Sequence, residues 1–124
     1  LREKGWFACM WNHRDLTETI QAKIENIIKS NIESYGYGTR REDQTKVIKK
    51  SMLFRDVLKV EGEVIHSQTI DECVEAWRSH ATLQRQAGDK FNTIITEINE
   101  YLNSLSVASI EIPYKTNIWI AQKI

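Results

Sequence analysis

The chain has 124 residues, 41% of them hydrophobic, and its 17 basic residues balance 17 acidic ones. This length and composition exclude a disordered segment and fit one domain with a buried core. The balanced charge excludes a general attraction to nucleic acid or to an anionic membrane, and leaves room only for a local patch. No apolar run is as long as a membrane span and no signal peptide is recognisable, so we expect a cytoplasmic protein.

The first half of the sequence predicts a strand followed by a helix. Leu1–Lys4, followed by Gly5, is typical of the end of a helix, which indicates a chain cut from a longer protein. Trp6–Trp11, "WFACMW", is an unbroken apolar run and predicts an interior strand buried on both faces. Asp15 and Glu18 have the spacing of a capping box. The helix that they would open has apolar residues at helical spacing: Leu16, Ile20, Ile24, Ile27, Ile28 and Ile32.

The middle of the sequence predicts a loop, a short helix and a long strand. The glycines of "SYGYGTRREDQ" are typical of a loop. A shorter helix with Val47, Ile48 and Met52 follows. Residues 54–67 then alternate around the apolar positions Leu58, Val60 and Val64, with Gly62 as a bend in the strand.

The last third predicts two helices and a final strand segment. Thr69 and Glu72 repeat the capping-box spacing. The apolar positions of the first helix are Ile70, Cys73, Val74, Trp77 and Ala81, and those of the second are Phe91, Ile94, Ile95, Ile98, Leu102 and Leu105. In "SIEIPYKTNIWIAQKI", Pro113 predicts a break or an edge between Ile112 and Asn117. The whole order predicts one α/β domain over residues 1–124, with helices layered on a sheet.

Several familiar chemical motifs are absent. "HRDL", His13–Leu16, also opens the catalytic loop of protein kinases, but Ile20 stands where that loop needs an Asn, and no DFG triplet follows. The histidines and cysteines lack the spacing of a zinc site, and no Gly-x-Ser-x-Gly elbow is present, so we expect no metal. Cys9 and Cys73 each lie in an apolar pattern, which predicts reduced thiols.

The order and wording of several segments carry a family resemblance. These segments are "LREKGWFACMWNHRD", "LFRDVLKVEGEVIHSQTIDECVEAWRSHATL", "FNTIITEINEYLNSL" and "IEIPYKTNIWIAQKI". They resemble the fifth strand, the next strand with its substrate-side helix, the last helix and the final strand of class I S-adenosylmethionine-dependent methyltransferases of the small-molecule type. In that family the final strand runs antiparallel to its neighbours. The resemblance implies a partial Rossmann-like sheet of about three strands with flanking helices, the C-terminal part of the methyltransferase fold.

The resemblance also implies a cofactor, S-adenosylmethionine, which the intact domain holds with a Gly-rich turn after its first strand and a carboxylate after its second. Neither feature occurs in these 124 residues. The Gly-x-Gly at Gly36 and Gly38 follows no strand and opens no clear helix. We therefore expect no cofactor-binding residues and no methyl transfer by this chain alone, and whether it acts as an enzyme stays open.

By resemblance, Asn12, His13 and Arg14 line the pocket of a small-molecule substrate, because they follow the apolar strand. The alternative is that Asn12 and Asp15 satisfy backbone donors at the start of the helix while His13 and Arg14 face solvent. No catalytic residue or general base is assigned.

Two further substrate-binding candidates come from other segments. Tyr37 lies with Tyr35, Arg40 and Arg41 in an aromatic and basic loop, which either closes over a ligand or decorates the surface. Trp77 lies on the predicted substrate-side helix, where it either contacts substrate or packs in the core.

The strand at Trp6–Trp11 also predicts association. If the neighbouring strand of the family's sheet is missing, one edge has unpaired backbone donors and acceptors, and we expect a homo-oligomer that pairs there. The alternative function is a free-standing α+β binding or dimerisation module without catalysis, whose half-sheet is completed by a second copy.

Overall fold

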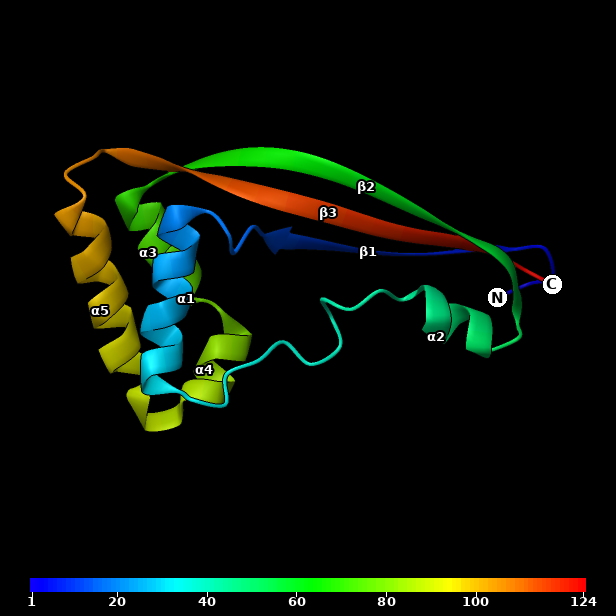
Figure 1. The fold of residues 1–124 in the computed structure, drawn as a ribbon, viewed down its shortest axis with the longest axis horizontal. Coiled ribbons are helices and arrows are strands. Elements are labelled where there is room, and N and C mark those ends of the chain that lie inside the picture. The colour runs from blue at the N-terminus through cyan, green and yellow to red at the C-terminus, as the bar shows by residue number, and fades with distance from the viewer. The chain divides into compact units, whose positions relative to one another are not determined.

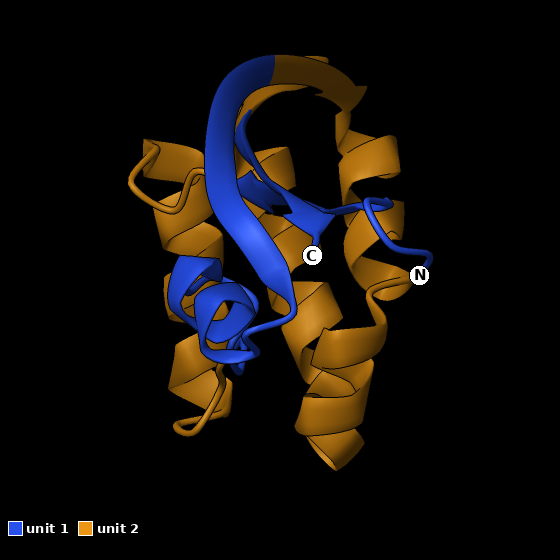
Figure 2. Ribbon diagram, turned by 90° about the vertical axis from the view of Figure 1, so that its right-hand side faces the viewer, with its two compact units in different colours: residues 1–14, 37–64, 114–124 blue, residues 15–36, 65–113 orange.

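The structure is a computed structural model that describes all residues, 1–124. These residues form two compact units (Figure 2). The first unit contains residues 1–14, 37–64 and 114–124, and the second contains residues 15–36 and 65–113. The expectation of a single domain over 1–124 stays a prediction.

Three strands, β1 (Trp6–Arg14), β2 (Phe54–Thr69) and β3 (Ser109–Lys123), form one sheet in the order β1-β3-β2 (Figure 1). β3 pairs antiparallel with β1, from Trp6 opposite Gln122 to Arg14 opposite Tyr114. It also runs antiparallel to β2, since Ile124 donates a hydrogen bond to the carbonyl of Leu53, whereas Ile70 donates to Ala108. The predicted α/β class, with a three-stranded sheet and an antiparallel last strand, is therefore confirmed.

One face of the sheet in the first unit packs against the short helix α2 (Thr45–Lys50). Ile48 of α2 contacts Trp119 and Ala121 of β3, and all three side chains are buried. Trp11 meets Trp119 edge to face, with 5.8 Å between ring centroids, an arrangement that aromatic pairs favour. Partly buried side chains complete the cluster: Phe7, Cys9, Trp11, Phe54 and Val57.

The opposite face of these strands is apolar and exposed. Trp6 and Met10 of β1 are 64% and 63% exposed. In β2, the Lys59 ammonium lies 5.4 Å from the centre of the buried tryptophan ring of β3, so Leu58 and Val60 on either side of Lys59 point to the other face. Cross-strand pairing places Ile118 and Ile120 of β3 on the same face, opposite Met10 and Ala8. We call this surface the open sheet face, and it comprises Trp6, Ala8, Met10, Leu58, Val60, Ile118 and Ile120.

Two predictions for the N-terminal segment are wrong. Residues 1–5 form a hydrogen-bonded turn in which Lys4 has φ 57°, and not the end of a helix. Trp6–Trp11 is not buried on both faces; β1 is an edge strand that alternates between exposed and half-buried side chains and continues to Arg14. The reason is that a helix covers only one face of the sheet here, which also leaves Leu58, Val60 and Val64 of β2 exposed.

Pro113 does not break β3, which continues through it as the central strand. Its effect falls on β1 instead. The last β1 pair is Arg14 with Tyr114, and at the next position Asp15 donates its N–H to the carbonyl of Pro113 at 2.8 Å. Because proline has no N–H, the return hydrogen bond of that pair cannot form, and the ladder ends there.

The second unit is built around α5 (Phe91–Ser104), which confirms the helix predicted after Gly88. α1 (Thr19–Asn31), α3 (Ile70–Arg78) and α4 (Ala81–Ala87) each pack against α5, and a 3-10 turn, Gly88–Lys90, leads into it. The core combines side chains of all four helices and the start of β3: Ile24, Ile28, Cys73, Val74, Trp77, Leu83, Ile94, Ile98, Leu102, Ile110 and Ile112.

Helix α1 differs from its prediction in both cap and face. It begins after Glu18, whose carboxylate accepts a hydrogen bond from the N–H of Gln21, so the Asp15–Glu18 capping box is wrong. Asp15 instead accepts hydrogen bonds from the N–H and hydroxyl of Thr17. The buried positions include Gln21 and Glu25 in addition to Ile24 and Ile28, so the buried face is rotated from the isoleucine stripe.

The capping box of α3 is confirmed: Thr69 Oγ1 accepts from the N–H of Glu72, and the Glu72 carboxylate accepts from the N–H of Thr69. The predicted continuation to Ala81 is wrong, because α3 ends at Arg78 and Ala81 is an exposed residue that begins α4.

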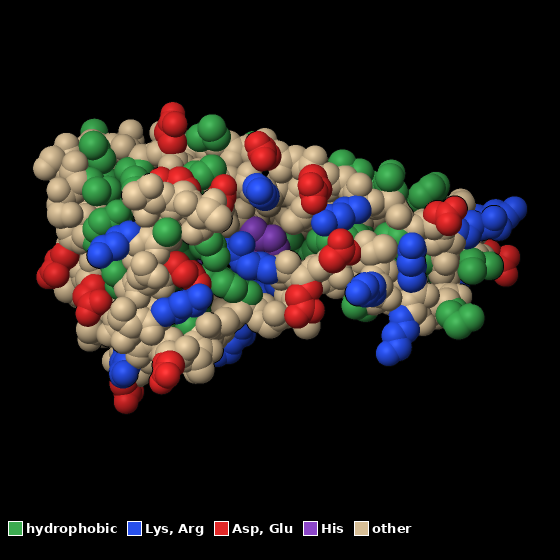
Figure 3. Space-filling view, viewed as in Figure 1, with side chains coloured by type: hydrophobic (Ala, Val, Ile, Leu, Met, Phe, Trp, Pro, Cys, Tyr) green, Lys and Arg blue, Asp and Glu red, His purple; other side chains and the backbone are tan.

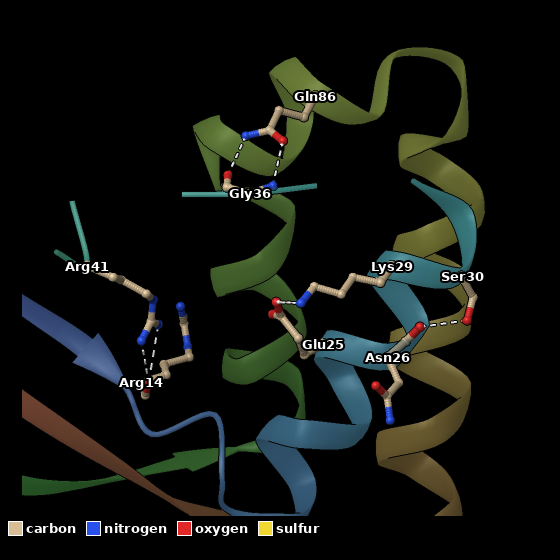
Figure 4. A network of polar contacts seen from close by, with 8 residues as sticks. All are labelled: Arg14, Glu25, Asn26, Lys29, Ser30, Gly36, Arg41 and Gln86. Carbon is tan, nitrogen blue, oxygen red and sulfur yellow. Dashed lines mark hydrogen bonds and ion pairs between the residues drawn. The ribbon is translucent and has the colours of Figure 1, made fainter. Parts of the chain in front are cut away.

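The loop after α1 is attached to α4. The side-chain amide of Gln86 forms hydrogen bonds with both the N–H and the carbonyl of Gly36 (Figure 4).

The cysteines are free thiols, as predicted, with Cys73 buried and Cys9 half-buried. Burial raises the pKa of Cys9, and a hydrogen bond with the backbone of Trp119 opposes that shift. None of the helices combines the length and the apolar composition that a bilayer span requires.

Candidate functional site

The carboxyl end of β1 and the loop at residues 37–41 meet within the first unit. The guanidinium of Arg41 donates hydrogen bonds from both terminal nitrogens to the carbonyl of Arg14, at 3.3 and 3.2 Å (Figure 4). His13 Nε2 lies 3.1 Å from the carbonyl of Arg40, and Arg40 Nε donates to the carbonyl of Tyr37 at 3.2 Å. Three residues that are distant from β1 in the sequence, Tyr37, Arg40 and Arg41, are thereby held at its carboxyl end.

Two tyrosine rings support guanidinium groups at this position. The Arg41 guanidinium carbon lies 4.5 Å from the centre of the Tyr37 ring, and that of Arg14 lies 5.8 Å from the centre of the Tyr114 ring. A guanidinium over an aromatic face is attracted by the ring quadrupole, which orients it without neutralising its charge. The strand-end site, as we name it, consists of Asn12, His13, Arg14, Tyr37, Arg40, Arg41 and Tyr114.

The charges of this site act on His13. Burial lowers the pKa of His13, and the charge of Arg41 lowers it further; the hydrogen bond to the Arg40 carbonyl opposes these effects. The imidazole is therefore neutral around pH 7, and its Nε2 must carry the proton, because a carbonyl oxygen can only accept. In the middle of the face drawn in Figure 3, Lys and Arg side chains (blue) lie beside histidine (purple).

The structure brings four of the five predicted substrate-binding residues together. Asn12, His13 and Arg14 lie in β1 itself and not in a loop after it, and Tyr37 lies beside them. Asn12 does not cap a helix; its side-chain oxygen accepts a hydrogen bond from the Thr116 hydroxyl at 2.9 Å.

Trp77 belongs to the second unit. Its side chain is 3% exposed and lies in the helical core, and its ring stacks on His80 with 5.1 Å between centroids. This placement agrees with the core-packing alternative given for Trp77.

Sequence reasoning missed Tyr114. No local motif marks it, because it joins the site only through its cross-strand pairing with Arg14. Pro113 is the residue of the sequence that indicates this pairing. It ends the β1 ladder and thereby fixes which residue of β3 lies opposite the last residue of β1.

The second unit has a separate open pocket of about 500 Å³. Its walls are mostly apolar, and two carboxylates, Glu18 and Glu111, lie at them. Glu18 already caps α1, and none of the predicted site residues lines this pocket. Its apolar lining comprises Ile20, Ile65, Leu105, Val107, Ile110 and Pro113.

The Gly-x-Gly segment, Gly36 to Gly38, does not fit as a cradle for S-adenosylmethionine. The N–H and carbonyl of Gly36 are both bonded to Gln86, and Gly38 lies in a loop that follows a helix and not a strand. No three His, Cys, Asp or Glu side chains are grouped as ligands of a metal ion. No protein-family model matches this chain, and no curated protein matches it. What the strand-end site offers chemically is a set of oriented N–H donors with positive charge and two aromatic rings.

Proposed function

We propose that this chain forms the substrate side of a class I S-adenosylmethionine-dependent methyltransferase that acts on a small molecule in the cytoplasm. The observation that carries the proposal is the strand-end site, where Asn12, His13 and Arg14 close a strand whose carboxyl end also receives the loop at residues 37–41. In open, mostly parallel α/β sheets, ligands bind outside the carboxyl ends of the strands, and β1 and β2 run in the same direction here because both are antiparallel to β3. The central β3, antiparallel to both of its neighbours, is also what the family resemblance implies.

The cofactor supplies a methyl group that its sulfonium has already activated. The side chains of this chain then have only to hold the acceptor in line and to exclude water. Arg14, Arg40 and Arg41 would orient the acceptor, and the rings of Tyr37 and Tyr114 would cover its apolar part. Because this chain lacks a cofactor cradle, we assign it no transfer step of its own.

Calorimetric titration with S-adenosylmethionine tests the proposal. We expect no binding to residues 1–124, and saturable binding to a chain extended by the residues encoded upstream of Leu1. The extended reading frame should contain a Gly-rich turn between a strand and a helix. An upstream sequence without that turn, together with no binding to the extended chain, would refute the methyltransferase assignment.

A second candidate function is a free-standing module that dimerises without catalysis. The exposed apolar side chains of the open sheet face and the free edge of β1 favour it. Gly5 and Asp15, at the two ends of β1, bond to β3, so the odd-numbered residues between them face β3 and the even-numbered ones face the free edge. A second copy of β1 can therefore pair at this edge, as we propose for the Trp6–Trp11 segment in either function.

Ala8→Pro tests the edge pairing, because Ala8 is exposed and its N–H faces the free edge. Proline is tolerated at strand edges but donates no hydrogen bond. We expect wild type and the control Ala8→Val to sediment as dimers or larger species at micromolar concentration, and Ala8→Pro as a monomer. A monomeric wild type would argue against both the edge pairing and the dimerisation module.

A further inference from the structure

We propose that the strand-end site binds an oxyanion, a carboxylate or phosphate group, of the small molecule that the protein recognises. The inference rests on the proposed function in taking that molecule to be the methyl acceptor. The binding itself follows from the arrangement of Arg40 and Arg41 around the end of β1.

The positive charges of Arg40 and Arg41 are held by neutral partners. Arg41 donates to the carbonyl of Arg14, and Arg40 donates to the carbonyl of Tyr37. A carbonyl dipole orients a guanidinium but leaves its net charge in place. Within the first unit Lys59 forms ion pairs with Asp43 and with Glu61, and neither Arg40 nor Arg41 takes part in these pairs.

The guanidinium groups of Arg40 and Arg41 are also already oriented before a ligand binds. Arg40 engages Nε, which leaves its two terminal nitrogens for an acceptor, and such a planar fork matches the two oxygens of a carboxylate or phosphate. Arg41 is fixed twice, by the Arg14 carbonyl and by the Tyr37 ring. Groups that are already oriented lose less conformational entropy when a ligand binds.

The surroundings favour a small organic anion over a polyanion. Glu42 and Asp43 follow Arg41 directly in the sequence, so a row of phosphates that extended past the arginines on this side would meet two carboxylates. The rings of Tyr37 and Tyr114 lie beside the guanidinium groups of Arg41 and Arg14, where they can contact the apolar part of an organic acid.

Anion titration followed by ¹H–¹⁵N NMR of the arginine Nε–H signals tests this inference. The probes are succinate and inorganic phosphate at constant ionic strength, with chloride as the reference salt. We expect saturable shifts of the Arg40 and Arg41 signals at millimolar anion. Tighter binding of succinate would assign the site to carboxylates, and tighter binding of phosphate would assign it to phosphoryl groups.

Matched variants localise the effect. Arg40→Gln and Arg41→Gln should each weaken binding about tenfold, the loss expected for one charge-assisted contact. Arg41→Lys should recover part of that loss, because it keeps the charge without the planar fork. The control Arg55→Gln, at an exposed residue of β2, should bind like wild type.

No saturable shift with either anion, or equal affinity in wild type and in the Arg40→Gln/Arg41→Gln double variant, would overturn the inference. Neither result depends on S-adenosylmethionine. Failure of this site is therefore distinguishable from failure of the methyltransferase assignment, which the calorimetric titration reports.

Discussion

Replacing Gln21 by methionine should stabilise the protein. Gln21 is 1% exposed, and neither its side-chain oxygen nor its side-chain nitrogen has a hydrogen-bond partner. A buried polar group without a partner costs about 1–3 kcal/mol in desolvation. Methionine has nearly the same length and no hydrogen bond to satisfy, so Gln21→Met should raise the free energy of unfolding by about that amount. The melting temperature should rise by roughly 3–5 °C for each kcal/mol.

Urea unfolding followed by far-UV circular dichroism measures this difference. The matched control is Gln84→Met, the same substitution at an exposed position of α4, which should stay within about 0.5 kcal/mol of wild type. If Gln21→Met unfolds at the same or a lower urea concentration than wild type while Gln84→Met is neutral, the amide of Gln21 must be satisfied in solution, and the reasoning fails.

Two further predictions concern a helix cap and a titration. Thr69→Ala should lower the free energy of unfolding by about 1 kcal/mol in the same urea assay, because it removes half of the capping box of α3, whereas Thr69→Ser should retain the cap; equal stability of all three proteins would contradict this. His13 should titrate below pH 6.5 by NMR, because burial and the charges of Arg41 and Arg40 favour its neutral form in the folded state. Its contribution to stability is therefore present above pH 6.5 and is lost as the pH falls toward the folded pKa; a folded pKa at or above 6.5 would show that the histidine is not held as described.

The elements that follow strong local patterns were predictable. The spacing of Ile94, Ile98 and Leu102 specifies α5, and Thr69 with Glu72 specifies the start of α3, since both depend on residues a turn apart in the sequence. The face of α1 was not predictable in this way. Gln21 and Glu25 are buried by the elements that pack against α1, whereas polar side chains such as theirs predict exposed positions.

Whether the side chains of β1 are buried also depends on which elements of the fold cover the sheet, and the local sequence does not contain this information. An apolar run such as Trp6–Trp11 indicates a strand that is suited to burial, but it does not supply a helix for each face. The sequence names four residues of the strand-end site, Asn12, His13, Arg14 and Tyr37, as candidates for substrate binding; the structure brings these four together, and their binding of substrate stays a prediction. The contact between the Arg41 guanidinium and the Arg14 carbonyl was not predictable, since it joins residues 27 positions apart through the fold.

The missing N–H of Pro113 also protects the alignment of the sheet. If β1 slid by two residues toward the start of β3, Pro113 would face His13 inside the ladder, where the absent donor leaves a carbonyl without its bond. A slide by one residue would turn Trp11 and Phe7 outward and Met10 inward. The proline opposes the first slide and the side-chain pattern opposes the second, so together they keep Arg14, at the tip of β1, opposite Tyr114.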